Sequence, residues 1–357
     1  MFTKLTEKLD SFLEMGVPFY DCIVMKNGKE AYRHSNGYTD ANKTKEVTGK
    51  ERYNIYSCSK LITCVSALQL WEKGLFSLDD KLSDYMPEFA QMTVRKGEEI
   101  VPAKTPILIR HLFTMTAGFS YDLNSPQIIK CKEETNGKCP TRELIRYLAK
   151  EPLLFEPGER WEYSLCHDVL AGLVEAVSGM RFGEYVNENI FKPLGMKNST
   201  FLLCDERLSE IINQYAFSTE KGVYERDKKI DYKFGTEYES GGAGCISTIE
   251  DYVKFIEALR IGDIILKKGT IDLMATNALA QEQMKGYWVD MYGYGLGQRC
   301  PKDDEKTDFG WGGAAGAYYA IDRKNQITVY TGTHILGYQD YQNRRSEILP
   351  IIQEILK

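Results

Sequence analysis

The chain has 357 residues, of which 43% are hydrophobic and 27% are charged, and its formal net charge at pH 7 is −6. This length can bury a large core in two layers or lobes, and the composition is that of a globular protein. The negative balance argues against nucleic acid as the main partner, because phosphate binding requires a basic surface.

The sequence lacks an apolar run of about 18 residues, the length that a transmembrane helix requires. Its charged, amphipathic start, residues 1–10, has no signal-peptide core. The nine cysteines lie mostly in apolar segments, where reduced thiols pack like small hydrophobic side chains. We therefore expect a cytoplasmic protein without a membrane span. The four histidines are scattered and C-x-x-C is absent, so we expect neither a metal site nor a cofactor.

The first elements in chain order are a helix and a hairpin. Residues 18–25 and 30–38 have the composition of strands, and the Asn27-Gly28 pair between them is typical of a tight hairpin turn.

The segment Ser57-Cys58-Ser59-Lys60 follows this hairpin. In S-x-x-K the lysine is one helical turn beyond the serine, so both side chains lie on one face. The apolar spacing after it predicts a helix that ends near Gly74. A serine at the start of that helix would have a base beside it and free backbone N–H groups around it. Ser218 also begins an S-x-x-K, but there the surrounding residues are charged and predict a solvated turn.

Helical patterns dominate from about residue 59 to 260, and strands return at 315–322 and 327–333 before a last helix over 341–357. These elements predict an α+β fold. An antiparallel sheet is formed by both chain ends and flanked by the terminal helices. Residues 1–75 and 240–357 would form this α/β domain, and residues 76–239 a mostly helical inserted lobe. A cleft between the two is the expected site.

Seven motifs, in this order, resemble the serine β-lactamase-like superfamily of class C β-lactamases, DD-peptidases and family VIII carboxylesterases. They are Tyr56–Lys60, Leu78–Pro87, Ile109–Gly118, Trp161–Ser164, Ile190–Met196, Gly241–Gly244 and Gly310–Gly316. The resemblance covers nearly the whole chain and implies the β-lactamase/transpeptidase-like fold.

The resemblance implies that Ser57 is the acylated nucleophile and Lys60 its general base, with a pKa held down by burial and by a second cation or hydrogen bonds. Tyr163 would be the partner that shuttles the proton to the leaving group. Which of Lys60 and Tyr163 takes the first proton stays open. The oxyanion hole would use the backbone N–H groups of Ser57 and Ala314, the latter on the strand after Trp311-Gly312-Gly313.

Two departures from the β-lactamase pattern favour the esterase branch. Leu165 stands where those enzymes have a substrate-binding asparagine, and a leucine cannot make that hydrogen bond. Trp311 stands where they have the lysine of K-T-G, so we expect an aromatic wall without a cation. Trp311, Gly312, Gly313, Leu165 and His334 are the predicted substrate-binding residues. His111 and His167 are expected to pack or to bond locally.

We therefore expect a serine hydrolase that forms an acyl-serine, most simply a carboxylesterase for small or aryl esters of acids that need no carboxylate. The alternatives are a β-lactamase, a D-amino-acid peptidase acting on an amide, or an acyltransferase. A member of a different class would be a catalytically silent protein for peptide binding or assembly. A Ser-His-Asp hydrolase is disfavoured because G-x-S-x-G is absent. The oligomeric state stays open.

Overall fold

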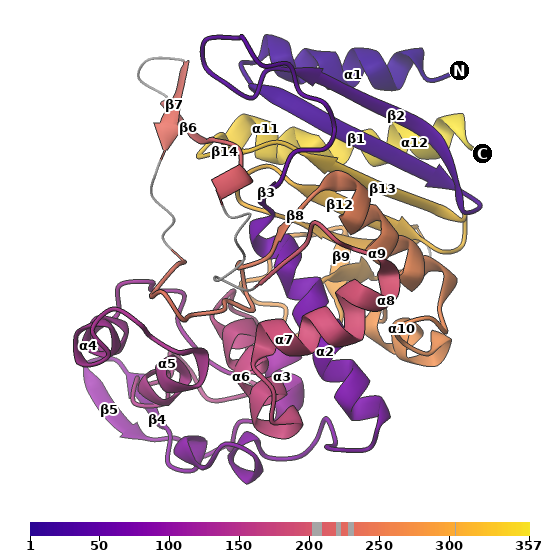
Figure 1. Ribbon diagram of the computed structural model, residues 1–357. Helices are drawn as coiled ribbons and strands as arrows, with labels where there is room; N and C mark the ends of the chain where they lie inside the picture. Colours follow the sequence, from indigo (N-terminus) through magenta and orange to yellow (C-terminus); the bar gives the residue numbers. More distant parts are fainter. Residues whose placement is uncertain (202–208, 219–222, 228–231, 304) are drawn as a thin grey trace.

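A computed structural model describes residues 1–201, 209–218, 223–227, 232–303 and 305–357. Within them, a sheet-containing part holds both termini, and a helical part lies beside it (Figure 1). No helix in the described part of the chain combines the length and the apolar character needed to cross a membrane.

Seven strands form one antiparallel sheet in the order β2-β1-β13-β12-β11-β10-β9. The strands are β1 (Phe19–Lys26), β2 (Lys29–Gly37), β9 (Tyr292–Tyr294), β10 (Arg299–Pro301), β11 (Asp308–Gly312), β12 (Tyr318–Asp322) and β13 (Ile327–Gly332). The predicted hairpin joins β1 to β2, and Asn27 and Gly28 both have positive φ, as a type I′ turn requires. Pairing of β1 with β13 joins the two chain ends, so the predicted α+β sheet is confirmed.

Helices cover both faces of the sheet (Figure 1). On one face lie α1 (Thr3–Glu14) and α12 (Ile348–Ile355), which contact each other and bury Leu5, Leu9 and Ile352 in one core. On the other face α9 (Ile249–Ile261) packs on β1, β12 and β13. The predicted last helix is divided, because α11 (Gln339–Arg344) and a 3-10 turn η6 (Arg345–Glu347) precede α12.

The helical part begins with α2 (Ser59–Glu72), which runs from the sheet into it and packs against α6 (Cys166–Ser178). Its other helices and turns are η2 (Leu82–Asp84), η3 (Pro87–Phe89), α3 (Ile109–Phe113), α4 (Pro126–Glu134), α5 (Thr141–Leu148), α7 (Phe182–Val186), the π-turn η4 (Asn187–Phe191) and α8 (Lys192–Leu194). A short hairpin joins β4 (Thr93–Lys96) to β5 (Glu99–Pro102). One hydrophobic core extends from the sheet residues Ile23 and Tyr330 into these helices.

The remaining elements lie between the two parts or beside the sheet. They are β3 (Tyr53–Asn54) paired with β8 (Ile246–Ser247), α10 (Lys268–Met274), and a small sheet of β14 (Ile335–Leu336), β6 (Gln214–Ser218) and β7 (Val223–Asp227). Pairing with β14 places β6 and β7 beside the sheet rather than among the helices of the predicted 76–239 lobe. The domain boundaries stay a prediction.

Candidate active site

Ser57 lies at the start of α2, in the 3-10 turn η1 (Tyr56–Cys58), and is 8% exposed. The residue before it, Tyr56, has φ = 49°, a left-handed conformation that is uncommon for a residue with a side chain. Such strain persists where the surroundings fix it. Here the Tyr56 hydroxyl hydrogen-bonds to Gln214, and its ring meets that of Tyr232 edge-on. The turn therefore holds Ser57 in one fixed orientation.

The structure brings together the three residues predicted to be catalytic. The Tyr163 hydroxyl donates to Ser57 Oγ at 2.6 Å, and Lys60 Nζ donates to the same oxygen at 3.3 Å. Lys60 Nζ also lies 4.7 Å from the centre of the Tyr163 ring. Both candidate proton acceptors therefore reach the serine, and the tyrosine makes the shorter contact.

The electrostatics of Lys60 differ from the prediction. Burial alone would lower the pKa of its ammonium group. The neighbouring Tyr121, Tyr163 and Asp168 outweigh burial and raise that pKa above its usual value. No second cation depresses it among the residues that the structure describes. The expectation of a depressed pKa is therefore wrong, and Lys60 is the positive charge of the site.

A glycine loop completes the lysine's surroundings. Lys60 Nζ donates to the Gly242 carbonyl at 2.7 Å, and the Gly242 N–H donates to buried Asp168 at 3.3 Å. A Cβ on Gly242 would lie 2.4 Å from Asp168 Oδ2, and one on Gly241 would lie 2.4 Å from the His167 carbonyl oxygen. The glycines of the Gly241–Gly244 motif thus let this loop pass between α2 and α6.

The predicted oxyanion donors border one cleft, because Ser57 and Ala314 both line it. No described residue accepts a hydrogen bond from the backbone N–H of either. Ala314 is not on a strand as predicted. It lies in a turn after β11, because the Gly313 N–H bonds to Ala317 O and reverses the chain. A Cβ on Gly313 would lie 2.3 Å from the Ile55 carbonyl oxygen, so glycine is needed there.

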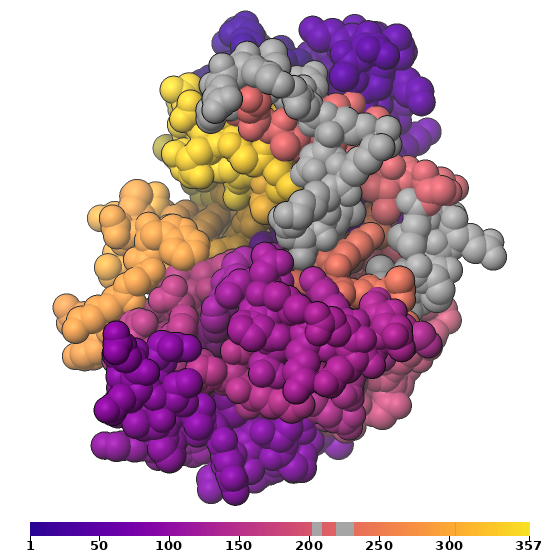
Figure 2. Space-filling view, turned by 90° about the vertical axis from the view of Figure 1, so that its left-hand side faces the viewer, coloured from indigo at the N-terminus to yellow at the C-terminus, as the bar shows by residue number. Residues whose placement is uncertain are grey.

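Aromatic side chains form the walls of this cleft, which has a volume of about 380 Å³. Trp311 lies nearly parallel to Tyr163, with the ring centres 6.1 Å apart, and Trp288 and Tyr121 complete the walls. The lining segments belong to the helical part and to the C-terminal strands and helices. Figure 2 shows a hollow where these magenta, orange and yellow segments meet. The aromatic wall expected of Trp311 is present.

The Trp311-Gly312-Gly313 segment itself offers no cation, but Arg345 of η6 lines the same cleft. Arg345 Nη1 donates to the carbonyls of Gly313 and Ala317, at 2.6 and 2.9 Å. Its Nη2 lies 2.2 Å from where a Cβ of Gly312 would be. No ion pair joins this guanidinium to a carboxylate in the described part of the chain, and burial lowers its pKa. No sequence motif points to Arg345, since it enters the site from the distant 3-10 turn η6.

Two predicted substrate-binding residues lie outside the cleft. Leu165 is 4% exposed and lines a separate pocket with Phe119 and Leu148. It lies directly before α6, where its backbone N–H donates to the Ser120 carbonyl. His334 is wholly buried behind the sheet edge. Its ring contacts the Asn54 side chain at 3.4 Å and the Asn213 carbonyl at 3.2 Å.

The other histidines pack as expected. His111 accepts a hydrogen bond from the Leu108 N–H, and burial lowers its pKa to about 4. His167 is wholly buried, contacts the Phe113 carbonyl at 3.4 Å, and has a pKa lowered by burial to about 3. Both rings are therefore neutral at pH 7. The described residues contain no cluster of three potential metal ligands.

Sequence reasoning missed Asp168, Tyr121 and Arg345. Asp168 lies shortly after Tyr163 in the chain, in the first turn of α6, where a buried carboxylate close to the motif is a signal for a site residue. It accepts hydrogen bonds from Tyr238, Ser240 and Gly242. Residues 219–222, which include most of the second S-x-x-K, lie outside the described residues.

This sheet, its inserted helices and its serine at the start of a central helix are those of a β-lactamase-like fold. The structure of EstCE1, a hydrolase with promiscuous acyltransferase activity, superposes with a TM-score of 0.78 at 24% identity, covering 93% of each chain. Unliganded simvastatin synthase from Aspergillus terreus, as its selenomethionyl derivative, gives 0.78 at 22% identity over 93% of this chain and 92% of that one. The predicted fold class is therefore confirmed.

The sequence comparisons identify the family to which the chain belongs. The Beta-lactamase family profile matches residues 17–349, so the chain belongs to the Beta-lactamase family, as its resemblance implied. Lovastatin esterase of Penicillium rubens is 29% identical over 306 residues, 76% of each chain. Esterase EstB of Burkholderia gladioli is 25% identical over 86% of this chain and 83% of its own.

A transferase is among the relatives as well. ML-236A carboxylate methylbutanoyltransferase of Penicillium citrinum is 30% identical over 239 residues, 64% of this chain. The match spans 57% of that enzyme's length. The relatives therefore include both esterases and acyltransferases.

Proposed function

We propose that this protein is a serine esterase that forms an acyl-enzyme at Ser57 and passes the acyl group to water or to an alcohol. The observation that carries the proposal is the contact of both Tyr163 and Lys60 with Ser57 Oγ. A serine hydroxyl needs such an adjacent acceptor to attack a carbonyl. The esterases and acyltransferases among the relatives support the same chemistry.

In the acylation step Tyr163 first loses its hydroxyl proton to solvent, and the resulting phenolate oxygen takes the Ser57 proton while Oγ bonds to the ester carbonyl carbon. The Lys60 ammonium group lies beside the ring and stabilises the phenolate. The carbonyl oxygen becomes an oxyanion that accepts hydrogen bonds from the N–H groups of Ser57 and Ala314. This tetrahedral intermediate then collapses, and the bond between the carbonyl carbon and the alkoxide oxygen breaks. The alkoxide takes the proton from Tyr163 and leaves as the alcohol.

Deacylation repeats these steps with an incoming hydroxyl. Tyr163 takes its proton, the oxygen attacks the acyl carbon, and Ser57 leaves and is reprotonated. Water gives the acid and an alcohol gives a new ester, so hydrolysis and acyl transfer need the same groups. The contacts of Tyr163 and Lys60 with Ser57 Oγ support a catalytic role over a silent one.

Aromatic walls favour esters over β-lactams as substrates of this cleft. Trp288, Trp311 and Tyr163 offer flat apolar surfaces, as an acyl or aryl group requires. Leu165, which stands where β-lactamases have a substrate-binding asparagine, lines a separate pocket. It therefore gives the amide of a β-lactam no hydrogen-bond partner in the Ser57 cleft. Arg345 supplies one cation for a polar or anionic substituent on the ester.

Steady-state hydrolysis of p-nitrophenyl acetate beside a chromogenic cephalosporin, with Ser57→Ala as the blank, tests the proposal. We expect ester turnover that depends on Ser57 and little cephalosporin cleavage. Added butanol should divert part of the acyl group to butyl acetate. Equal ester turnover by wild type and Ser57→Ala would contradict the proposal, and dominant cephalosporin cleavage would favour the β-lactamase alternative.

A further inference from the structure

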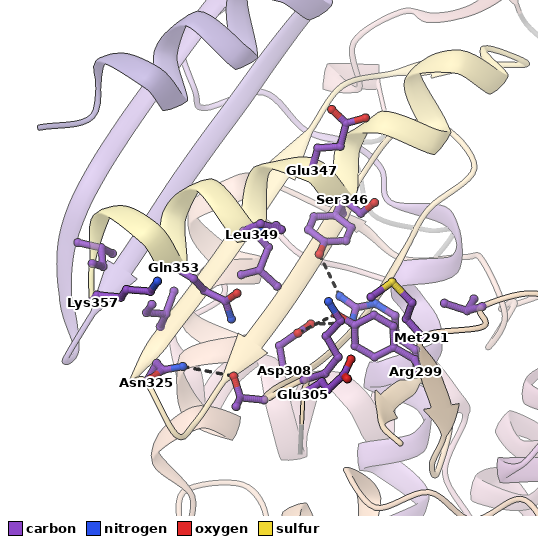
Figure 3. Close-up of a pocket in the computed structure, with 18 of the residues that line it drawn as sticks. Met291, Arg299, Glu305, Asp308, Asn325, Ser346, Glu347, Leu349, Gln353 and Lys357 are labelled. Carbon is purple, nitrogen blue, oxygen red and sulfur yellow. Dashed lines mark hydrogen bonds and ion pairs between the residues drawn. The ribbon is translucent and has the colours of Figure 1, made fainter. Parts of the chain in front are cut away.

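A second, larger cavity lies beside the Ser57 cleft, between α12 and strands β9 to β11 (Figure 3). Its volume is about 540 Å³, within the range of ligand-binding pockets. In Figure 3, Leu349 and Gln353 point from α12 toward the sheet, and Arg299 and Asp308 lie on the opposite side. We call this cavity the α12 pocket.

The α12 pocket and the Ser57 cleft are adjacent. Four residues line both: Val289, Arg299, Tyr318 and Ser346. The Arg299 guanidinium donates to the Tyr318 hydroxyl at 2.9 Å, so the two side chains form a common polar edge. These four side chains therefore form the boundary between the two cavities.

The α12 pocket suits an uncharged, mainly apolar group. Met291, Ile327, Leu349, Pro350 and Leu356 contribute apolar lining. An aliphatic chain placed there would leave water for an apolar surface, which is the main source of affinity for such groups.

The buried charges that line the α12 pocket are matched within the protein, whereas Glu305 and Lys357 line it from exposed positions and Lys306 from a half-buried one. Arg299 pairs with Asp308 at 2.6 Å and lies over the Tyr292 ring at 4.2 Å. Lys26 donates to the carbonyls of Asn325 and Leu356, at 2.8 and 2.9 Å. The buried charges of the pocket therefore need no ionic ligand as a partner.

The loop before β9 adds an exposed apolar border to both cavities. Trp288, which lines the Ser57 cleft, is 60% exposed, and Met291, which lines the α12 pocket, is 58% exposed. Val289, between them in sequence, lines both cavities. Adjacent large apolar side chains in water are typical of a binding surface. They would cover a chain that runs from one cavity to the other.

We propose that the α12 pocket binds the aliphatic chain of an elongated ester whose scissile carbonyl lies at Ser57, an inference that rests on the proposed function. The chain belongs either to the acyl group or to the alcohol. In both cases this chain would enter between Val289, Tyr318 and Ser346. The protein would then favour medium-chain esters over acetate esters of short alcohols.

Two substrate series distinguish the two sources of the chain. One runs from p-nitrophenyl acetate to the butyrate, octanoate and decanoate, and the other from ethyl acetate to hexyl and decyl acetate. We expect kcat/KM to rise about tenfold for every two methylenes in the series whose chain enters the pocket. A flat profile in both series, with Ser57-dependent turnover, would overturn the pocket proposal and leave the proposed function standing.

Ser346→Trp fills the shared opening from an exposed position. We expect it to lower the ratio of long-chain to short-chain kcat/KM about tenfold. Asn343→Trp, on exposed α11 and outside both cavities, is the matched control and should keep the wild-type ratio. An unchanged ratio in a folded Ser346→Trp would overturn the proposal.

Calorimetric titration with decanamide measures binding to the α12 pocket without requiring turnover. We expect binding that Ser346→Trp weakens about tenfold and Asn343→Trp does not. If this binding is found but no ester is cleaved, the proposed function falls and the pocket stands. If esters are cleaved but decanamide binds equally to all three proteins, the pocket proposal falls.

Discussion

At the scale of single residues, the contact of the Tyr163 hydroxyl with Ser57 Oγ is the basis of the proposed chemistry. A raised pKa keeps Lys60 protonated, so the ammonium group serves better as a fixed charge than as the first proton acceptor. This supports our proposal that Tyr163, and not Lys60, is the first proton acceptor.

Tyr163→Phe should lower kcat for p-nitrophenyl acetate by about 10²- to 10⁴-fold, because it removes the proton acceptor. Tyr294→Phe is the matched control, since that buried hydroxyl has no hydrogen-bond partner among the described residues. Steady-state kinetics on both variants checks this. A rate close to wild type in Tyr163→Phe would assign the proton transfer to Lys60 alone.

Leu165→Asn should not create β-lactam turnover, because the side chain lies outside the Ser57 cleft. It should instead lower the stability by about 1–3 kcal/mol, since it places an amide in an apolar, buried position. Thermal unfolding and cephalosporin cleavage measure the two effects. If the variant gained cephalosporin cleavage at unchanged stability, the side chain at position 165 would have to face the Ser57 cleft.

At the scale of elements, the site depends on two tight segments, the glycine loop of Gly241–Gly244 and the turn after β11. The first brings the Gly242 carbonyl to Lys60, and the second brings the Ala314 backbone to the cleft beside Ser57. Their glycines are needed because neighbouring atoms leave no room for a Cβ.

Gly242→Ala should reduce both activity and stability, because the added carbon would lie 2.4 Å from Asp168 Oδ2 and 3.3 Å from Lys60 Nζ. Gly269→Ala in α10 is the control, since no described atom lies within 4 Å of its added carbon. It should be neutral or stabilise by about 0.4–1 kcal/mol. Unfolding curves and kcat on both variants test this; a Gly242→Ala protein with normal activity would mean that the loop does not hold Lys60.

Arg345→Met should lower kcat for neutral esters about 10²-fold by loosening the turn that carries Ala314. The guanidinium holds that turn through two carbonyls, and one oxyanion donor contributes about this factor. Arg344→Met, an exposed neighbour on α11, is the control. If Arg345→Met changed only KM, and only for anionic esters, Arg345 would bind substrate without positioning the turn.

At the scale of the whole molecule, the sheet joins both chain ends, and the strand pair β1–β13 buries a carboxyl group. Burial raises the pKa of Asp21 to about 7, and the nearby Ser35 hydroxyl offsets only part of this change. The unfolded chain releases this proton near pH 4, whereas the folded chain keeps it until about pH 7. Folding is therefore favoured most below pH 4, and this contribution is lost as the pH rises through 7.

Asp21→Asn should remove that part of the pH dependence, so its melting temperature should exceed that of the wild type by more at pH 8 than at pH 5. Asp290→Asn, an exposed carboxylate, should follow the wild type at both values. Melting curves at the two pH values suffice. Parallel shifts of wild type and Asp21→Asn would show that Asp21 is ionised in the folded protein throughout.

The sequence predicted the hairpin, the sheet from both ends and the central serine helix, because local periodicity and turn chemistry determine them. It also identified Ser57, Lys60 and Tyr163 through family motifs. It could not place Arg345, His334 or Leu165, because their surroundings come from the packing of distant segments. No local pattern encodes that a helix residue near the C-terminus reaches the turn after β11.

The most direct test of the central claim is mass analysis of the acyl-enzyme. The protein is mixed with p-nitrophenyl octanoate, quenched in acid within its first turnovers and digested. We predict the mass of one octanoyl group on the peptide that contains Ser57, and none in Ser57→Ala. Turnover without that adduct, or the acyl group on another residue, would contradict the account.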